Sequence, residues 1–303
     1  MNAVSLENVC KSFGRLNAVD KLTVEVPAGS IYGFLGPNGA GKTTTLRMIM
    51  NIIRPDSGSI SIFGDGSIEQ AKGRIGYMPE ERGLYRKMTV SKVLAYFGVL
   101  KGVNAYELGG RVQKWLQRVE LGDWANKKVE NLSRGMHQKL QFAVTVINEP
   151  ELLILDEPFS GLDPLNQELL KEIILEMRDE GKTIIFSTHV MHEAEELCGS
   201  ILLINKGKTV LDDRLDQICS QHSSGAVSVE LEGDTTFIKT LAIVRKAETD
   251  GNRLQITLAD DADPQQLLRA LVERVTVQAF EVKVPSLHEI FVNLVGASNA
   301  EDS

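Results

Sequence analysis

Cysteine is scarce in this chain, and the few cysteines present exclude two common ways of stabilising a fold. The 303 residues include only three, Cys10, Cys198 and Cys219, which lie far apart. An odd number at irregular spacing gives neither a disulfide framework nor the paired spacing of a zinc site. We therefore expect a reducing compartment and a fold held together by its hydrophobic core.

Long apolar runs and an excess of positive charge are also missing. The longest apolar stretch, VLAYFGVL at residues 93–100, is far shorter than the roughly 18 residues of a membrane span. The first residues lack the basic and apolar regions of a signal peptide. With 33 Lys and Arg against 41 Asp and Glu, the net charge is -8, which argues against nucleic acid as the main partner. A role at a membrane would require another subunit to supply the spanning helices.

What the chain does contain is an alternation of short apolar strands and helices, the pattern of an α/β fold with a largely parallel sheet. Its hydrophobic fraction of 43% and charged fraction of 24% are those of a soluble globular protein. Strands are expected at residues 4–9, 22–26, 31–35, 58–63, 75–78, 152–155, 183–187 and 201–204. Phe13 is expected in the turn after the first strand. Helices are expected at residues 42–51, 89–102, 105–120, 133–148 and 165–180.

The pattern changes near residue 218, where QHSSGA at 221–226 is typical of a linker. We therefore divide the chain into domains at 1–217 and 218–303. The second domain has the element order βαββαβ, the ferredoxin-like pattern, and no catalytic constellation. Its expected elements are strands 227–231, 243–248, 253–258 and 275–284, helices 235–242, 264–273 and 286–295, a turn at 250–252 and a disordered tail at 297–303. A dimerisation or regulatory role and a purely stabilising role both stay open.

Residues 36–43, GPNGAGKT, match the phosphate-binding pattern G-x-x-x-x-G-K-[ST] at every fixed position. They follow an apolar strand and precede a helix, so loop N–H groups and the helix dipole would face a phosphate. This context disfavours an accidental glycine-rich turn. Lys42 should reach the β- and γ-phosphates, and the Thr43 hydroxyl should ligate Mg²⁺. The residues expected to contact a nucleotide are Gly36, Asn38, Gly39, Ala40, Gly41, Lys42, Thr43 and Thr44.

A second apolar strand, at 152–155, runs into Asp156 and Glu157. It would deliver both carboxylates to the carboxyl edge of the sheet, where open α/β sheets bind ligands. Asp156 would hold Mg²⁺, and Glu157 would orient and polarise the attacking water. The alternative is an acidic pair that caps the next helix. Together, the phosphate loop, the Asp156–Glu157 pair and the pattern of strands and helices lead us to expect a P-loop NTPase. It would have a mostly parallel core sheet, an antiparallel β part at its N-terminus and a helical subdomain at about 85–150.

With these motifs in place, residues 1–217 resemble the ATP-binding subunit of an ABC transporter. LSRGM at 132–136 resembles the family's signature sequence, usually LSGGQ, and SGLD at 160–163 resembles its D-loop. Arg134, Met136 and Glu80 depart from the family pattern. The resemblance implies that Phe13 stacks on adenine and that Glu80, in the Q-loop, lies near the nucleotide and Mg²⁺. It implies that Ser133 and Gly135 contact the γ-phosphate and that Asp163, in the D-loop, lies beside the nucleotide. It also implies that His189 is a switch histidine that takes part in catalysis with Lys42 and Glu157.

The same resemblance implies partners and a location. The signature residues would contact ATP held by another subunit, so two copies (or this chain and a similar one) would sandwich two ATP molecules. The family works with a transmembrane permease, on the cytoplasmic side of the membrane. Residues 79–88 and 284–296 resemble ABC-2 exporter subunits, which include sodium-efflux and antibiotic-resistance ATPases.

Three alternatives to these expectations stay open. The chain would otherwise be a non-transport ABC ATPase of translation or DNA repair, or a regulatory module with an inactive ATP site. Taken alone, His189 would be an ordinary histidine at a strand end.

Overall fold

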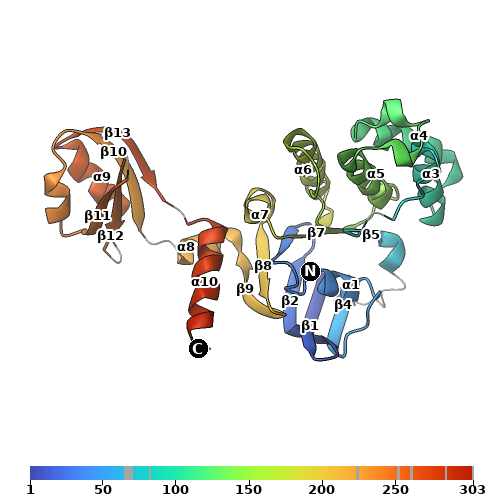
Figure 1. Cartoon of the computed structure of the whole chain (residues 1–303), viewed down its shortest axis with the longest axis horizontal. Coiled ribbons are helices and arrows are strands. Elements are labelled where there is room, and N and C mark those ends of the chain that lie inside the picture. Colours follow the sequence, from blue (N-terminus) through green and yellow to red (C-terminus); the bar gives the residue numbers. More distant parts are fainter. Residues whose placement is uncertain are drawn as a thin grey trace. The chain divides into compact units, whose positions relative to one another are not determined.

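The computed structural model describes residues 1–301 except 65–70, 82, 223–224, 251–252, 260–261 and 284. The chain forms two compact units, Met1–Leu215 and Asp216–Ser303 (Figure 1). Across the part of the chain that is described, no helix is long and apolar enough to cross a membrane.

A six-stranded sheet forms the centre of the first unit. Its first five strands run parallel, and the last pairs antiparallel at the edge. Every residue of β3, β6 and β7 is buried, as their continuous apolar sequences predict. In sheet order the strands are β5 (Ile75–Met78), β6 (Leu152–Asp156), β7 (Thr183–Thr188), β3 (Ile31–Leu35), β8 (Ser200–Asn205) and β9 (Lys208–Arg214).

A separate antiparallel sheet packs with α1 (Lys42–Ile49) against one side of this core. Its strands, in sheet order, are β2 (Leu16–Pro27), β1 (Asn2–Phe13) and β4 (Ser57–Ile62). Apolar side chains from both sheets and the helix, among them Leu6, Phe34 and Leu46, share one buried cluster. The first two strands are longer than predicted, and Phe13 is the last residue of β1 rather than part of the turn, because cross-strand pairing with Leu16 continues up to it.

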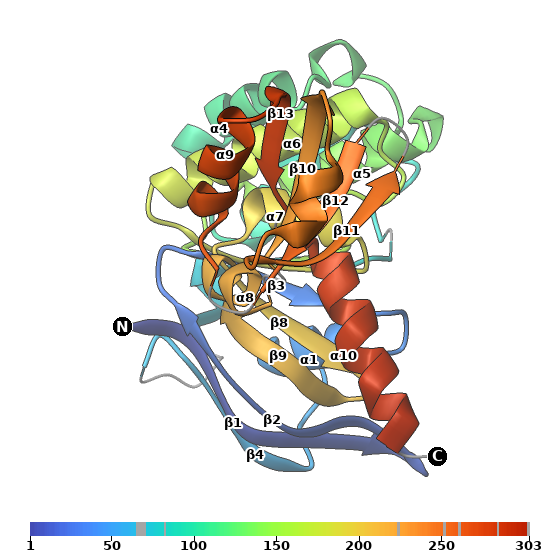
Figure 2. The same ribbon diagram turned by 90° about the vertical axis from the view of Figure 1, so that its left-hand side faces the viewer.

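Helices cover the other side of the central sheet (Figures 1 and 2). The five helices predicted for residues 1–217 are all present. In the helical subdomain, Trp115 and Phe142 pack edge to face with ring centroids 6.4 Å apart. The helices on this side are α3 (Val90–Leu100), α4 (Ala105–Arg118), α5 (Arg134–Val146), α6 (Pro164–Asp179) and the unpredicted α7 (Met191–Leu197).

The second unit is an antiparallel sheet with α9 (Pro264–Val272) packed on it. Val229, Ile256 and Leu267 belong to its separate core. The predicted order βαββαβ is present with one correction: the helix expected at 235–242 is a short 3-10 helix, Thr236–Thr240. The β-branched Thr236, Ile238 and Thr240 favour an α-helix poorly. The strands, in sheet order, are β11 (Val244–Asp250), β12 (Arg253–Leu258), β10 (Ala226–Glu232) and β13 (Thr276–Val282).

Two further expectations for this part of the chain change. The predicted linker overlaps the end of a helix, α8 (Leu215–Gln221), and residues 223 and 224 lie outside the described residues. The tail expected to be disordered from residue 297 continues α10 (Leu287–Glu301) as helix, because no proline interrupts the segment. Residues 251 and 252 of the predicted turn, and residues 302 and 303 of the tail, are not among those described.

Candidate functional site

The fold brings the predicted motifs to one edge of the central sheet. β6, β7 and β3 are neighbours, and Asp156 lies beside Ser187 while Leu35 lies beside Thr188. Because these strands are parallel, their carboxyl ends meet at the same edge. The phosphate loop follows β3, Glu157 follows β6 and His189 follows β7, so three segments distant in sequence form one site.

The phosphate loop takes a backbone conformation that requires glycine at two crowded positions. Gly36 and Gly41 have φ angles of 147° and 112°. A Cβ would lie 2.1 Å from the Ile204 carbonyl oxygen at Gly36, and 2.4 Å from that of Ala18 at Gly41. Gly41 precedes α1 and supplies no side-chain cap. The N–H groups at the start of α1 are therefore available to an anion.

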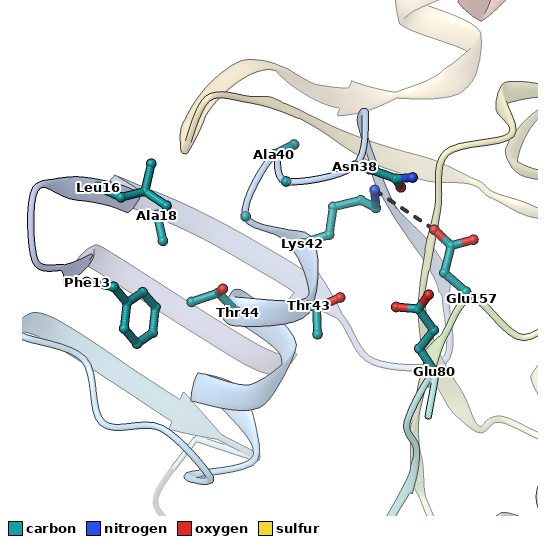
Figure 3. A pocket seen from close by; sticks show the side chains of 12 residues that line it. Phe13, Leu16, Ala18, Asn38, Ala40, Lys42, Thr43, Thr44, Glu80 and Glu157 are labelled. Carbon is teal, nitrogen blue, oxygen red and sulfur yellow. Dashed lines mark ion pairs between the residues drawn. The ribbon is translucent and has the colours of Figure 1, made fainter. Parts of the chain in front are cut away.

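Lys42 is buried with its ammonium group over the loop. Its Nζ donates to the carbonyl oxygens of Gly36 at 2.6 Å and Pro37 at 3.2 Å, and lies 3.9 Å from Glu157 Oε1 (Figure 3). Burial lowers the pKa of Lys42, while the negative charges of Glu157, Asp156 and Glu80 oppose that shift. The loop thus holds a cation where a phosphate chain would need its charge balanced.

Asp156 is fully buried and joins the loop to the neighbouring strand. Its Oδ1 accepts hydrogen bonds from the hydroxyl of Thr43, at 3.1 Å, and from that of Ser187. Its Oδ2 is buried and has no hydrogen-bond partner among the residues that the structure describes. An orphaned carboxylate oxygen beside a threonine hydroxyl fits a hard cation such as Mg²⁺ or its bound water.

The two candidate protein ligands, Asp156 and Thr43, are enough for a Mg²⁺ site. In the described part of the chain, no group of three or more His, Cys, Asp and Glu side chains is arranged to hold a metal ion. Mg²⁺ characteristically uses one or two carboxylates together with phosphate oxygens and water. The donor set of Asp156 and Thr43 therefore fits this ion better than one that needs a complete protein cage.

Glu157 and His189 form the second polar group of the site. His189 Nδ1 lies 3.0 Å and 3.1 Å from the two carboxylate oxygens of Glu157, whose side chain is almost buried. Glu157 has a φ of 50°, rare for a residue with a side chain, and its N–H donates to the Ser187 carbonyl oxygen at 3.2 Å. Such strain costs roughly 1–3 kcal/mol and is commonest where function fixes a side chain.

Two glutamines on α5 contribute contacts that the sequence analysis does not predict. Gln138 Nε2 donates to the carbonyl oxygens of Glu157, at 3.2 Å, and Pro158, at 2.9 Å. Gln141 Nε2 donates to those of Pro79, at 2.6 Å, and Glu81, at 3.3 Å, on either side of Glu80. Both side chains are buried. Helix α5 therefore supports both acidic loops of the site.

A cavity of about 320 Å³ lies between the β1–β2 hairpin and the phosphate loop (Figure 3). Its volume lies within the usual range of small-molecule sites. Phe13 is 48% exposed at one end of it, and Glu80 and Glu157 approach the other. The residues that line it are Phe13, Leu16, Ala18, Asn38, Gly39, Ala40, Gly41, Lys42, Thr43, Thr44, Glu80 and Glu157.

The predicted signature and D-loop residues lie together, but they do not line this cavity. Ser133 begins α5 by accepting a hydrogen bond from the Met136 N–H at 3.2 Å. Asp163 begins α6 by accepting one from the Asn166 N–H at 3.0 Å, and this bond lowers the pKa of its carboxyl group. A Cβ on Gly135 would lie 3.3 Å from Leu162, so the two loops are adjacent.

A glycine-rich loop, the lysine at its end (Lys42) and the acidic residues after β6 together define a P-loop nucleotide-binding protein. Residues 19–160 match the ABC transporter family, and residues 214–295 match the C-terminal domain of DrrA1-3-like ATP-binding proteins. The chain is 43% identical to the ABC transporter ATP-binding protein YhaQ of Bacillus subtilis, over 97% of this chain and 99% of YhaQ. It belongs to the family of ABC transporter ATP-binding proteins.

Two further relatives agree. The Nod factor export ATP-binding protein I of Ralstonia nicotianae is 33% identical, over 97% of this chain and 94% of its own length. A solved ATP-binding subunit of an ABC transporter, 30% identical, matches with a TM-score of 0.67 over 72% of this chain and 92% of its own. The predicted fold and family are confirmed, including the likeness to exporter subunits.

These findings settle the general function. The chain is an ATP-binding subunit with the ATPase domain of a membrane transporter, and such subunits work with transmembrane components. Neither the family matches nor these relatives support the translation, DNA-repair or inactive-module alternatives.

Proposed function

We propose that this chain is a Mg²⁺-dependent ATPase that powers export, with ATP closing a dimer and hydrolysis reopening it. The observation that carries the proposal is the position of the Glu157 carboxylate. It borders the cavity of the phosphate loop, 3.9 Å from Lys42 Nζ and 3.0 Å from His189 Nδ1. Similarity to an export ATP-binding protein supports the outward direction.

The cavity is suited to hold ATP along its length. The exposed ring of Phe13 would stack on adenine at one end, while Asn38, Gly39, Ala40 and the following residues wrap the phosphates. Lys42 would exchange its two carbonyl contacts for β- and γ-phosphate oxygens. Because those contacts are made by a buried ammonium group, binding an anion there satisfies a charge that burial disfavours.

Thr43 and Asp156 would hold Mg²⁺, with Glu80 near enough to contact it or its water. When bound, the ion would offset the charge of the phosphates and polarise the transferred group. Glu80 replaces the family's usual glutamine, so three carboxylates surround Lys42 here. We expect this acidic set to make nucleotide binding depend strongly on the cation.

Glu157 would accept a proton from the attacking water, and His189 would contact the γ-phosphate. The strained backbone at Glu157 fixes the direction of its side chain, and Gln138 donates to the carbonyl groups of Glu157 and Pro158. The half-exposed ring of His189 lies against both carboxylate oxygens, so it can orient the base as well as sense the phosphate.

Ser133, Gly135 and Asp163 would act on ATP bound by a second subunit. Their loops lie side by side outside the chain's own cavity, and the capped start of α5 presents N–H groups that favour an anion. This arrangement supports a homodimer or a heterodimer with a similar chain. We place the pair on the cytoplasmic face of the membrane, bound to a transmembrane permease that supplies the path for the cargo.

Glu157→Gln tests the catalytic assignment by phosphate release in the presence of Mg²⁺. We expect ATP binding to persist and turnover to fall at least about 100-fold, because the amide cannot accept the proton. Glu172→Gln, an exposed change on α6, is the matched control and should leave turnover unaltered. Full turnover by Glu157→Gln would reject Glu157 as the base.

Asp156→Asn tests the metal assignment separately. It should raise the Mn²⁺ concentration required for half-saturation, measured by electron paramagnetic resonance with ATP present, by at least about tenfold. Unchanged Mn²⁺ affinity would reject Asp156 as part of the metal site.

A further inference from the structure

One threonine hydroxyl fixes the backbone on both sides of His189. Thr188 is fully buried at the end of β7, and its Oγ1 accepts a hydrogen bond from the Val190 N–H at 3.0 Å. The same hydroxyl donates to Glu193 Oε2 at 2.6 Å. A hydroxyl donates one proton and accepts through its lone pairs. Donation to Glu193 and acceptance from Val190 together fix the orientation of the Thr188 hydroxyl. His189 thus lies between two residues whose relative position is determined by one hydroxyl group.

Glu193 is the anchor of this arrangement. It lies in the first turn of α7, and burial raises the pKa of its carboxyl group. The hydrogen bond from Thr188 opposes that rise, as do the charges of Lys171 on α6 and His189, while Glu157 adds to it. The Glu193 carboxylate is partly buried, and it accepts the Thr188 hydrogen bond with reduced competition from water.

Helix α7 is itself tied to the helix that follows the D-loop. Lys171 on α6 is buried and forms ion pairs with Glu196 of α7 and, at 2.9 Å, with Glu168 of α6. The carboxylates of Glu196 and Glu168 are exposed, so these pairs contribute little to holding the helices together. Helix α7 also packs on β3 and β7, and its Ala194 and Leu197 are buried. Glu193 therefore acts from a fixed helix on a loop that carries a functional side chain.

We propose that Glu193 is a positioning residue for His189, which it holds against Glu157 through the hydroxyl of Thr188. The proposal rests on the proposed role of His189 in ATP hydrolysis. Neither Glu193 nor Thr188 lines the nucleotide cavity, so their loss should act on the chemical step and leave ATP binding intact. Without the acceptor, the Thr188 hydroxyl reorients and the His189 ring no longer stays 3.0–3.1 Å from the Glu157 carboxylate.

A double-mutant cycle between Glu193 and His189 tests the proposal in the full-length chain. Glu193→Ala should lower kcat about tenfold and leave the KM for ATP within about twofold, as expected for the loss of one hydrogen bond to a charged group. In the His189→Ala background the same change should lower kcat by less than about twofold, because its target is gone. Glu195→Gln, on the same helix but paired with His192, is the control and should leave kcat unchanged.

Rescue by the conservative variant separates positioning from general damage. Glu193→Gln keeps an oxygen that accepts the Thr188 proton, so kcat should stay within about threefold of the unmodified chain. Thr188→Val should match Glu193→Ala, and the two together should cost no more than either alone. The imidazole resonance of His189, assigned by its loss in His189→Ala, should shift in Glu193→Ala and stay in place in Glu193→Gln.

The possible failures are distinguishable. Unchanged kcat in His189→Ala would overturn the role of His189 in the proposed function, and Glu193 would have nothing to position. If His189→Ala lowers kcat as expected, but Glu193→Ala lowers it a further tenfold in the His189→Ala background, the positioning role alone is overturned. If thermal melting shows that Glu193→Ala does not fold, Glu193→Gln and Thr188→Val decide the question. A large loss of kcat in Glu193→Gln would then contradict the proposal.

Discussion

Two glycines of the phosphate loop, Gly39 and Gly41, provide a matched pair of alanine substitutions. Both have positive φ angles, 80° and 112°. Apart from its own chain neighbours, a Cβ on Gly39 meets no atom of the described residues within 4 Å. A Cβ on Gly41 meets the Ala18 carbonyl oxygen at 2.4 Å, well inside the 3.0 Å below which real Cβ atoms are essentially never found. The pair therefore compares alanine at a positive φ angle in open space with alanine at a positive φ angle that also meets a clash.

The expected costs follow from these contacts. An alanine at positive φ loses about 1 kcal/mol, partly offset by the lower entropy of the unfolded chain, so Gly39→Ala should destabilise by about 1 kcal/mol or less. Gly41→Ala adds a clash with β2, whose position is fixed by pairing with β1 and by the hydrogen bond from Asp20 N–H to the Gly207 carbonyl oxygen. We expect a total near 3 kcal/mol for this variant.

Urea unfolding followed by tryptophan fluorescence measures the difference. Both tryptophans, Trp115 and Trp124, belong to the first unit, so their signal reports on the unit that carries the loop. The midpoint for Gly41→Ala should fall well below that for Gly39→Ala, with similar slopes. ATP binding should weaken more in Gly41→Ala, because the N–H groups that follow it are displaced. Equal midpoints for the two variants would refute the reasoning from the crowded loop geometry.

Three other predictions concern α5 and its surroundings. Burial lowers the pKa of Lys101, which donates to the Thr145 carbonyl oxygen, to about 8. The unfolded chain then binds more protons between pH 8 and the ordinary lysine pKa near 10.4, so the free energy of unfolding should rise with pH across that window. Relative to Lys101→Met in urea titrations, the rise should be about 2 kcal/mol, allowing for partial exposure; a flat difference would contradict it. Gln138→Ala should lower kcat about tenfold with ATP affinity retained, because the carbonyl groups of Glu157 and Pro158 lose their donor; unchanged kcat in a phosphate-release assay would count against this. Ser133→Ala should cost about 1 kcal/mol in urea unfolding through the lost cap of α5, and no change would contradict the capping role.

Local sequence patterns predict the parts of the site that depend on neighbouring residues. The phosphate loop is such a part, because its glycines, lysine and following helix are contiguous. Ser133 and Asp163 are others, since a helix cap depends on the next three residues. The parallel strands around Asp156 follow from their apolar runs, because only a strand covered on both faces tolerates such composition.

Contacts between distant segments are not predictable in this way. Ser187 on β7 donates a hydrogen bond to Asp156 on the neighbouring strand β6. Gln138 and Gln141 on α5 donate to loops that no local sequence pattern connects to this helix. The missed strand β9 is mostly polar because it lies at the sheet edge, so it lacks the apolar signal of its neighbours. Glu193 resembles any exposed acid of a helix start until the fold places it beside Thr188.

The central claim is that ATP hydrolysis by Glu157 takes place in a site completed by a second subunit. Light scattering of Glu157→Gln with and without Mg²⁺ and ATP tests it most directly. We predict the 33.4 kDa mass of one chain without nucleotide and twice that mass with it, with doubling abolished by an added Ser133→Arg change. A variant that binds MgATP and keeps the mass of a single chain would contradict the account.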